Sequence, residues 1–391
     1  MVRVSPPVPL LAGNVGAALY EAAQACAGDV LQLAAQIAQV PAPTNSELLR
    51  SDYISTLMDD LGFVDVRGDE LGDVSGVVRG ILPSPQVLIA AHIDTVFPME
   101  TPLSIHVGST QSFGPGIGDN CLGVAAALTI PEMLSRANVQ TATDVIVTGN
   151  VGEEGLGDLR GMKAVMDANK GIGAVIALEG HNLGRVTHVA VGSRRYRVTV
   201  TGPGGHSWGD YGNTSAIHAA AEIINQLANI ELPVNPKTTF NVGTIEGGIS
   251  VNTIAPSASF LLDLRSVEGK SLDRLSAQVE AVIESVVPDV EVVFEVIGER
   301  PSGVVQTDSR IIRLASSILE SIGIQPVGDA SSTDANIPIS RGIPAVCIGL
   351  TTGGNVHRED EFIDNGPVAD GLYQMLALTV TVSASLSQGQ L

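Results

Sequence analysis

Five histidine and acidic residues could do chemistry together in this chain, although they are spread across most of its length. They are His92, Asp119, Glu154, Glu179 and His357. Imidazole and carboxylate ligands without a thiolate suit Zn²⁺ in a hydrolytic site, and the same ligands can hold Co²⁺ or Mn²⁺. These residue types therefore predict a two-metal site that catalyses hydrolysis, provided that the fold brings them together.

Short apolar segments stand before most of these residues and predict the strands that position them. Continuous apolar runs of this kind suit strands that are covered on both faces. In open α/β sheets ligands bind outside the carboxyl ends of the strands, so residues far apart in the sequence can converge there. The segments are 87–91 before His92, 145–148 before the pair Glu153 and Glu154, 175–178 before Glu179, and 346–348 ahead of the loop that holds His357.

Two close neighbours of these residues add catalytic possibilities. Asp94 follows His92 at a spacing that lets its carboxylate hydrogen-bond the ring nitrogen that does not bind metal. Glu153 and Glu154 are adjacent, so one could bind metal while the other takes a proton from water that the metal acidifies. Taken singly, each feature also fits a turn or an exposed acidic loop, and Asp119 also fits a helix cap.

The composition argues against several classes of function. The formal net charge of −21 would repel a phosphate backbone, so nucleic acid is not expected as a partner. Cys26, Cys121 and Cys347 are odd in number and far apart, which argues against a disulfide framework and indicates a reducing compartment. No segment reaches the roughly 18 apolar residues of a membrane helix, and residues 1–30 lack an uninterrupted signal core. We therefore expect a cytoplasmic protein with no membrane partner.

The order of expected elements predicts two domains in these 391 residues. Both ends of the chain alternate between strand and helix, including a helix expected over residues 123–134 after Asp119, which predicts an α/β domain with a mixed, mostly parallel sheet. From Gly192 the pattern changes to a βαββαβ order with half-buried strands, typical of a ferredoxin-like α+β domain. We expect a discontinuous metal-binding domain, residues 1–191 and 298–391, into which residues 192–297 are inserted.

Four motifs, taken in their order along the chain, resemble the M20 metallopeptidases. They are Ala91–Pro98, Gly118–Ala125, Gly152–Gly155, and His357 with Glu361. The M20 group contains glutamate carboxypeptidase, acetylornithine deacetylase, succinyl-diaminopimelate desuccinylase, aminoacylases and peptidase T. The resemblance runs through nearly the whole chain, and the inserted βαββαβ domain agrees with it.

The resemblance implies a role for each of the five predicted ligands. His92 and Glu179 would hold one Zn²⁺, Glu154 and His357 would hold a second, and Asp119 would bind both. Co²⁺ or Mn²⁺ could replace the zinc ions. Two ions about 3.5 to 4 Å apart can polarise a scissile carbonyl together, so the implied reaction is hydrolysis of an amide bond.

Further residues would complete the implied active site. Glu153 would act as the general base, and Asp94 would support the ring of His92. In the inserted domain, Gly204–Ser207 resembles the lid motif of the family, whose histidine, here His206, reaches the active site of the other subunit and stabilises the oxyanion. The resemblance therefore implies a homodimer formed through the inserted domain.

Asn252 and Arg265 match lid positions that contact the carboxylate of the substrate in the family. The planar guanidinium of Arg265 suits such an anion. A structural ion pair between Arg265 and Asp263, or another carboxylate, is the alternative.

We expect the substrate to be a small peptide or an N-acyl amino acid. Glu179, rather than an aspartate, resembles the carboxypeptidase and deacylase members. A tripeptide aminopeptidase similar to peptidase T is a second possibility, and it would require a free α-amine. A catalytically silent metal- or peptide-binding relative is a third, but such a protein should have lost a ligand or the base, whereas Glu153 and all five ligands are present.

Overall fold

The computed structural model describes residues 11, 14–285 and 289–391. The remaining residues, which include the first ten of the expected metal-binding domain, lie outside this description. Among the described residues, no helix is both long and apolar enough to cross a membrane.

The chain forms two compact units, of which the second is inserted into the first. The first unit comprises Met1–Ala190 and Val304–Leu391, and the second comprises Val191–Gly303. The expected boundary at residue 297 falls inside a strand, because β14 (Glu291–Arg300) continues three residues further.

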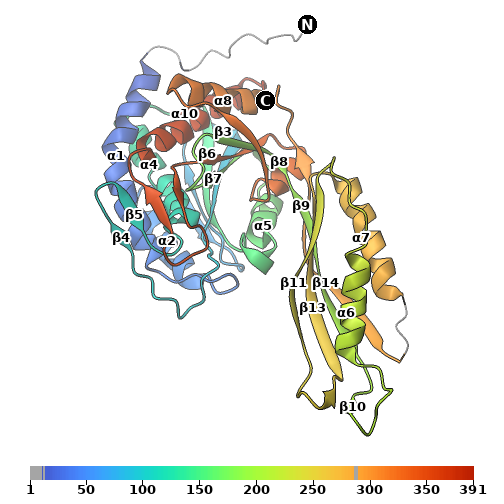
Figure 1. Ribbon diagram of the computed structural model, residues 1–391. Coiled ribbons are helices and arrows are strands. Elements are labelled where there is room, and N and C mark those ends of the chain that lie inside the picture. Colours follow the sequence, from blue (N-terminus) through green and yellow to red (C-terminus); the bar gives the residue numbers. More distant parts are fainter. Residues whose placement is uncertain (1–10, 12–13, 286–288) are drawn as a thin grey trace. The chain divides into compact units, whose positions relative to one another are not determined.

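A nine-stranded mixed sheet forms the centre of the first unit (Figure 1). Its strands follow the order β1-β2-β6-β3-β7-β17-β8-β15, and β16 pairs with β8. The central strands β6, β3, β7 and β17 pair in parallel, which confirms the expected mostly parallel sheet. The strands are β1 (Val64–Gly68), β2 (Val74–Val78), β3 (Leu82–His92), β6 (Thr143–Asn150), β7 (Ile172–Glu179), β8 (Arg185–Ala190), β15 (Gly303–Val304), β16 (Val327–Ser331) and β17 (Ala345–Gly349).

Helices cover both faces of this sheet, and alternate residues of β3 pack into the two resulting cores. Val87, Ile89 and Ala91 contribute to one core, whereas Leu88 and Ala90 contribute to the other. The first core includes residues of α1 (Val15–Ala38), α2 (Leu48–Asp60), α3 (Gly123–Leu128), α4 (Ile130–Arg136), α8 (Arg310–Ser321) and α10 (Val368–Ser387), and the second includes residues of α5 (Arg160–Ala168) and α9 (Asn336–Ser340).

The region after Asp119 differs from the sequence pattern, which predicts one helix over residues 123–134. The structure has two short helices there, α3 and α4, which meet at Thr129. Pro131 lies in the first turn of α4, where its missing N–H is tolerated and where it interrupts the preceding helix.

A small antiparallel sheet in the first unit joins two loops that are distant in the sequence. It has the order β18-β19-β5-β4. The pairing of β19 with β5 brings the loop that contains His357 beside the segment that leads to Asp119. The strands are β4 (His106–Val107), β5 (Gln111–Phe113), β18 (Gly353–Gly354) and β19 (Phe362–Asp364).

The second unit has the expected βαββαβ order. Its four-stranded antiparallel sheet runs β11-β13-β9-β14, and two helices pack on one face of this sheet (Figure 1). Alternate residues of β9, Tyr196, Val198 and Val200, are buried beneath the helices, as their period of two predicts. The other elements are β9 (Gly192–Thr201), α6 (Ala216–Leu227), β11 (Thr238–Gly247), β13 (Ser257–Ser266) and α7 (Gly269–Glu284), and a separate two-stranded antiparallel sheet pairs β10 (Gly205–His206) with β12 (Thr253–Ile254).

Candidate metal centre

The parallel strands end at a common edge, and this edge carries the expected ligands. His92 is the last residue of β3, and Glu179 is the last residue of β7. The strand β6 ends at Asn150, which pairs with His92, so Glu153 and Glu154 follow at the same edge. The apolar strands therefore bring these residues together, as the sequence predicts.

Asp119 lies between the two histidines of the predicted set. Its Oδ1 atom is 3.1 Å from Nε2 of His92, and its Oδ2 atom is 3.0 Å from Nε2 of His357. Nε2 of His92 is also 3.7 Å from Oε2 of Glu179, and Nε2 of His357 is 3.2 Å from Oε1 of Glu154. The structure thus forms two groups of donor atoms, with one oxygen of Asp119 in each.

These donor atoms fit a pair of metal ions. The groups are His92, Asp119 and Glu179 on one side, and Asp119, Glu154 and His357 on the other; within each, the atoms lie within 4.8 Å of one another. Two ligand atoms at about 2.0 to 2.1 Å from one zinc in tetrahedral geometry lie about 3.3 Å apart. The four distances between donor atoms, from 3.0 to 3.7 Å, bracket this value.

The charges of the site show how strongly it favours a cation. Hydrogen bonds to Asp119 and Glu154 raise the pKa of His357 to about 10. Burial alone would lower the pKa of His92, but the neighbouring carboxylates, Asp119 first among them, outweigh burial and raise it well above the usual value. Protons on the two rings thus balance the carboxylates, and a divalent ion would supply the same charge by displacing them.

Asp94 is fully buried, but its contacts differ from the expected one. Its carboxylate oxygen is 3.7 Å from Nδ1 of His92, too far for a hydrogen bond, whereas its backbone carbonyl oxygen lies 3.1 Å from that nitrogen. The carboxylate instead accepts the backbone N–H groups of Glu153 and Glu154, each at 2.9 Å, and the hydroxyl of Thr44 at 2.9 Å. Asp94 therefore fixes the glutamate pair and orients His92 through its own backbone.

Two further polar side chains hold the strand ends, and the sequence pattern did not single them out for this. Arg50 of α2 is 1 % exposed and donates from Nη1 to the carbonyl of Ile93 at 2.7 Å. Asn120 donates to the carbonyl of Leu178 at 2.7 Å and accepts the N–H of Gly180 at 3.0 Å. Asn120 thus grips the backbone on both sides of Glu179, directly beside Asp119.

Comparison with known proteins places this geometry in a family. The model of the M20 peptidase dimerisation domain matches residues 190–291, and the model of peptidase family M28 matches residues 74–229. The chain belongs to the M20/M28 peptidases. It is an M20-type metallopeptidase, and hence a hydrolase.

Relatives of this metallopeptidase differ in how much of the chain they cover. An uncharacterized protein from Bacillus subtilis (strain 168), YqjE, is 25 % identical over 334 residues, which cover 80 % of this chain and 87 % of YqjE. Acetylornithine deacetylase from Myxococcus xanthus is 28 % identical over 215 residues, which cover 48 % of this chain and 55 % of that enzyme. The second match therefore spans about half of each protein.

Solved structures share the fold of this metallopeptidase over nearly its whole length. Aminopeptidase PepT from Bacillus cereus has a TM-score of 0.74 at 20 % identity and covers 92 % of this chain and 99 % of its own. The YXEP protein from Bacillus subtilis, described as a dinuclear metal binding peptidase of the M20 family, has a TM-score of 0.67 at 16 % identity and covers 92 % and 99 %. At this identity the likeness shows the fold.

In the second unit of the metallopeptidase, His206 and Asn252 lie together at the two-stranded sheet of β10 and β12. His206 pairs with Thr253 across β10 and β12, and the carbonyl of Asn252 accepts the N–H of Ser207 at 3.0 Å. Nδ1 of His206 lies within 3.1 and 3.2 Å of the N–H groups of Trp208 and Gly209 and accepts both. The neutral ring therefore carries its proton on Nε2, where it can be donated.

Arg265 of the second unit takes part in an ion pair, as the structural alternative predicts. Its Nε atom donates to Asp263 at 2.6 Å, and Asp263 also accepts from Nε of Arg195 at 2.9 Å. The side chain of Arg265 is 43 % exposed, so the rest of the guanidinium can still meet a ligand.

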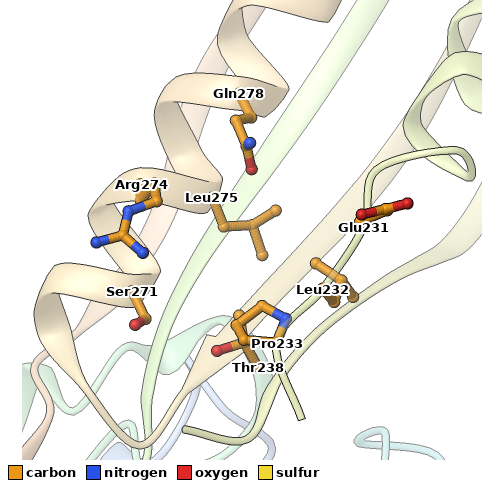
Figure 2. Close-up of a pocket in the computed structure, with 8 residues that line it drawn as sticks. All are labelled: Glu231, Leu232, Pro233, Thr238, Ser271, Arg274, Leu275 and Gln278. Carbon is orange, nitrogen blue, oxygen red and sulfur yellow. The ribbon is translucent and has the colours of Figure 1, made fainter. Parts of the chain in front are cut away.

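A cavity of about 300 Å³ in the second unit contains none of the expected site residues. It lies between α7 and the segment that leads into β11, and Figure 2 shows the side chain of Leu275 on the helix pointing toward Leu232 and Pro233. Its lining combines apolar and polar side chains without a cluster of metal-binding groups. The chemistry of the first unit therefore has no counterpart there.

Proposed function

We propose that this metallopeptidase uses two metal ions to hydrolyse an amide bond in a small peptide or an N-acyl amino acid, as carboxypeptidases and deacylases do. The observation that carries the proposal is the position of Asp119, which offers one oxygen to each of two histidines. Each histidine has a further carboxylate beside it, and a third histidine–carboxylate group, His92, Glu153 and Glu154, adds the expected base to the same site.

Each proposed ligand is assigned to one or both of the two metal ions. His92 and Glu179 would hold one ion, Glu154 and His357 the other, and Asp119 both. The ligand types suit Zn²⁺, with Co²⁺ or Mn²⁺ as alternatives. A pair of such ions supplies Lewis acidity, which polarises a carbonyl group and lowers the pKa of water to about 7.

Glu153 is the proposed general base. The buried carboxylate of Asp94 accepts the backbone N–H of Glu153 and so fixes the position from which the Glu153 side chain projects, beside Glu154. In this role its carboxylate takes a proton from the attacking water and delivers that proton to the leaving nitrogen. This transfer completes amide cleavage without a covalent enzyme intermediate.

His206 is the proposed donor to the oxyanion, supplied by the other subunit of a homodimer. Two observations support this role. The match with the M20 peptidase dimerisation domain covers this region, and the backbone contacts of Nδ1 leave the ring proton on Nε2. A donor already oriented before the reaction stabilises negative charge as it develops on the carbonyl oxygen.

Asn252 and Arg265 are proposed to bind the carboxylate of the substrate. The similarity to acetylornithine deacetylase supports an N-acyl amino acid, since such a substrate carries a free carboxylate. The guanidinium of Arg265 keeps partly exposed donors despite its ion pair with Asp263. In a chain with a net charge of −21, such local donors are needed to hold an anion.

Activity after metal removal and replacement tests the proposal. Metal-free protein is supplied with Zn²⁺, Co²⁺ or Mn²⁺ and assayed on N-acyl amino acids, dipeptides, tripeptides, and the same tripeptides after N-acetylation. We expect metal-dependent cleavage that does not require a free α-amine. Cleavage that N-acetylation abolishes would replace this proposal with an aminopeptidase, and metal uptake without cleavage of any substrate would indicate a silent binding protein.

A further inference from the structure

A single buried carboxylate, that of Glu361, holds the backbone from which Asp119 projects. Glu361 is 0 % exposed. Its Oε1 atom accepts the N–H of Asp119 at 2.8 Å and that of Gly118 at 2.9 Å, and its Oε2 atom accepts the N–H of Gly116 at 3.1 Å. Three backbone donors of one loop thus converge on one side chain.

The same carboxylate connects this loop to two others that carry proposed ligands. Oε1 of Glu361 is 2.9 Å from Nε2 of His181, which follows Glu179 by two residues. Glu361 itself follows His357 by four residues. Glu361 and His181 therefore join the segments that present the Asp119, Glu179 and His357 side chains.

The packing around this pair leaves little freedom. A Cβ atom added to Gly118 would collide with the imidazole of His181, so the loop approaches this closely only because residue 118 is glycine. Removing a carboxylate from water is costly unless hydrogen bonds replace its hydration, and the three N–H groups and the imidazole do so here. The buried carboxylate of Glu361 therefore indicates that the hydrogen-bonded geometry of this loop is needed.

We propose that Glu361, together with His181, is a positioning residue of the metal centre. It fixes the loop at Gly116–Asp119 so that the two oxygens of Asp119 point to the two metal positions. This inference rests on the proposed function, in which Asp119 is the shared ligand. Groups behind metal ligands typically change metal affinity or activity by about 10- to 100-fold when they are altered.

The substitution Glu361→Gln tests this role with little change in volume. A glutamine offers one acceptor oxygen and one amide group that donates, so it cannot accept all of these N–H groups. The matched control is Asp144→Asn. Asp144 is 2 % exposed, accepts the N–H of Gly80 at 2.8 Å and pairs with Arg79, but it lies in β6 at the end opposite to the metal-binding edge.

The measurements are the affinities for Zn²⁺ and Mn²⁺, obtained by competition with a chelator, and the thermal unfolding of each metal-free protein. We expect both variants to unfold at lower temperature, but only Glu361→Gln to lose metal affinity, by about 10- to 100-fold at both ions. Affinity equal to that of the wild-type protein would overturn the inference. Should Glu361→Gln fail to fold, His181→Gln replaces it, with the same expected loss and the same contrary outcome.

The wild-type titration separates the inference from the proposed function. Two bound ions in the wild type with unchanged affinity in the variant would remove only the role of Glu361. A wild-type chain that binds no metal ion would overturn the proposed function and this inference with it.

Discussion

Asp119 and the two histidines beside it set up a competition between protons and metal ions. The metal-free site holds its histidines protonated because carboxylates surround them, and the same carboxylates attract a cation. A histidine binds metal only as the neutral ring, so each ion that enters must displace a proton. The pH at which the protein is handled therefore affects how much metal it contains.

This competition predicts that metal affinity rises with pH. The pKa of His357 is about 10 in the metal-free protein, so below pH 10 its proton must leave before the ring can bind an ion. The apparent affinity should increase about tenfold per pH unit for each proton displaced. Zn²⁺ titrations at pH 6, 7 and 8, with proton release measured by calorimetry in buffers of different ionisation enthalpy, check this. Affinity that is constant over this range would contradict it.

Glu153 gives a second prediction at the scale of one residue. In Glu153→Gln we expect kcat to fall by about 10²- to 10⁴-fold, because the amide cannot accept the proton of the attacking water. Metal affinity should stay close to that of the wild type, since the adjacent Glu154 is the proposed ligand. Chelator competition and steady-state kinetics measure the two quantities. The partly exposed Glu132, which pairs with Arg136, provides the control Glu132→Gln. A large loss of metal from Glu153→Gln would reverse the roles of Glu153 and Glu154.

At the scale of the elements, the sequence predicts where the strands end, but it does not predict the side chains that hydrogen-bond to the backbone there. Apolar runs before His92 and Glu179 predict buried strands, and the parallel arrangement then brings both ends to one edge. Arg50, by contrast, acts on the backbone carbonyl of Ile93, and a hydrogen bond to a carbonyl leaves no mark on the residue that accepts it. Asp94 was identified, but its bonds to backbone N–H groups depend on a loop whose path the pattern does not contain.

The segment between β1 and β2 predicts an effect of pH on stability through Asp73. This residue is 2 % exposed, and burial, followed by the nearby Asp69 and Asp334, raises its pKa to about 8 even though it accepts the N–H of Val151. An unfolded chain has an aspartate pKa of about 3.9, so the folded protein binds this proton more tightly. Its contribution to stability is complete below about pH 4 and is lost as the pH rises through 8.

Asp73→Asn removes this titration. We expect the free energy of unfolding of the metal-free variant, relative to that of the wild type, to improve from pH 5 to about pH 8 and to level off above it, whatever the difference at pH 5. Urea denaturation across this range measures it. A difference that does not change with pH would show that Asp73 keeps an ordinary pKa in the folded protein.

At the scale of the whole molecule, the inserted unit was predictable because β9 alternates between polar and apolar residues, whereas the central strands of the first sheet, β3, β6, β7 and β17, contain continuous apolar runs. The C-terminal boundary of the inserted unit was harder to predict, because β14 continues through Gly298, Glu299 and Arg300, which do not alternate between polar and apolar residues. The break between α3 and α4 has a local cause, Pro131, that a helical pattern of apolar residues concealed.

The proposed dimer predicts that two inactive variants restore activity when mixed. His206→Ala should lower kcat by about 10²- to 10³-fold without loss of metal, because the oxyanion loses one oriented donor. A mixed dimer of His206→Ala and Glu153→Gln would contain one active site with both residues intact. After exchange of subunits, about a quarter of wild-type activity should return if subunits associate at random. No recovery in verified mixed dimers would place His206 in the active site of its own chain, or outside catalysis.

The composition of β3 bears on how its register in the sheet is fixed. Because residues 87–91 are apolar on both sides of the sheet, a slip of one residue would leave apolar groups facing both cores, and hydrophobicity alone would penalise it little. The same slip would carry His92 away from Asp119 and Ile93 away from the guanidinium of Arg50. The polar contacts at the end of β3 thus select one register for a strand whose apolar residues would allow more than one.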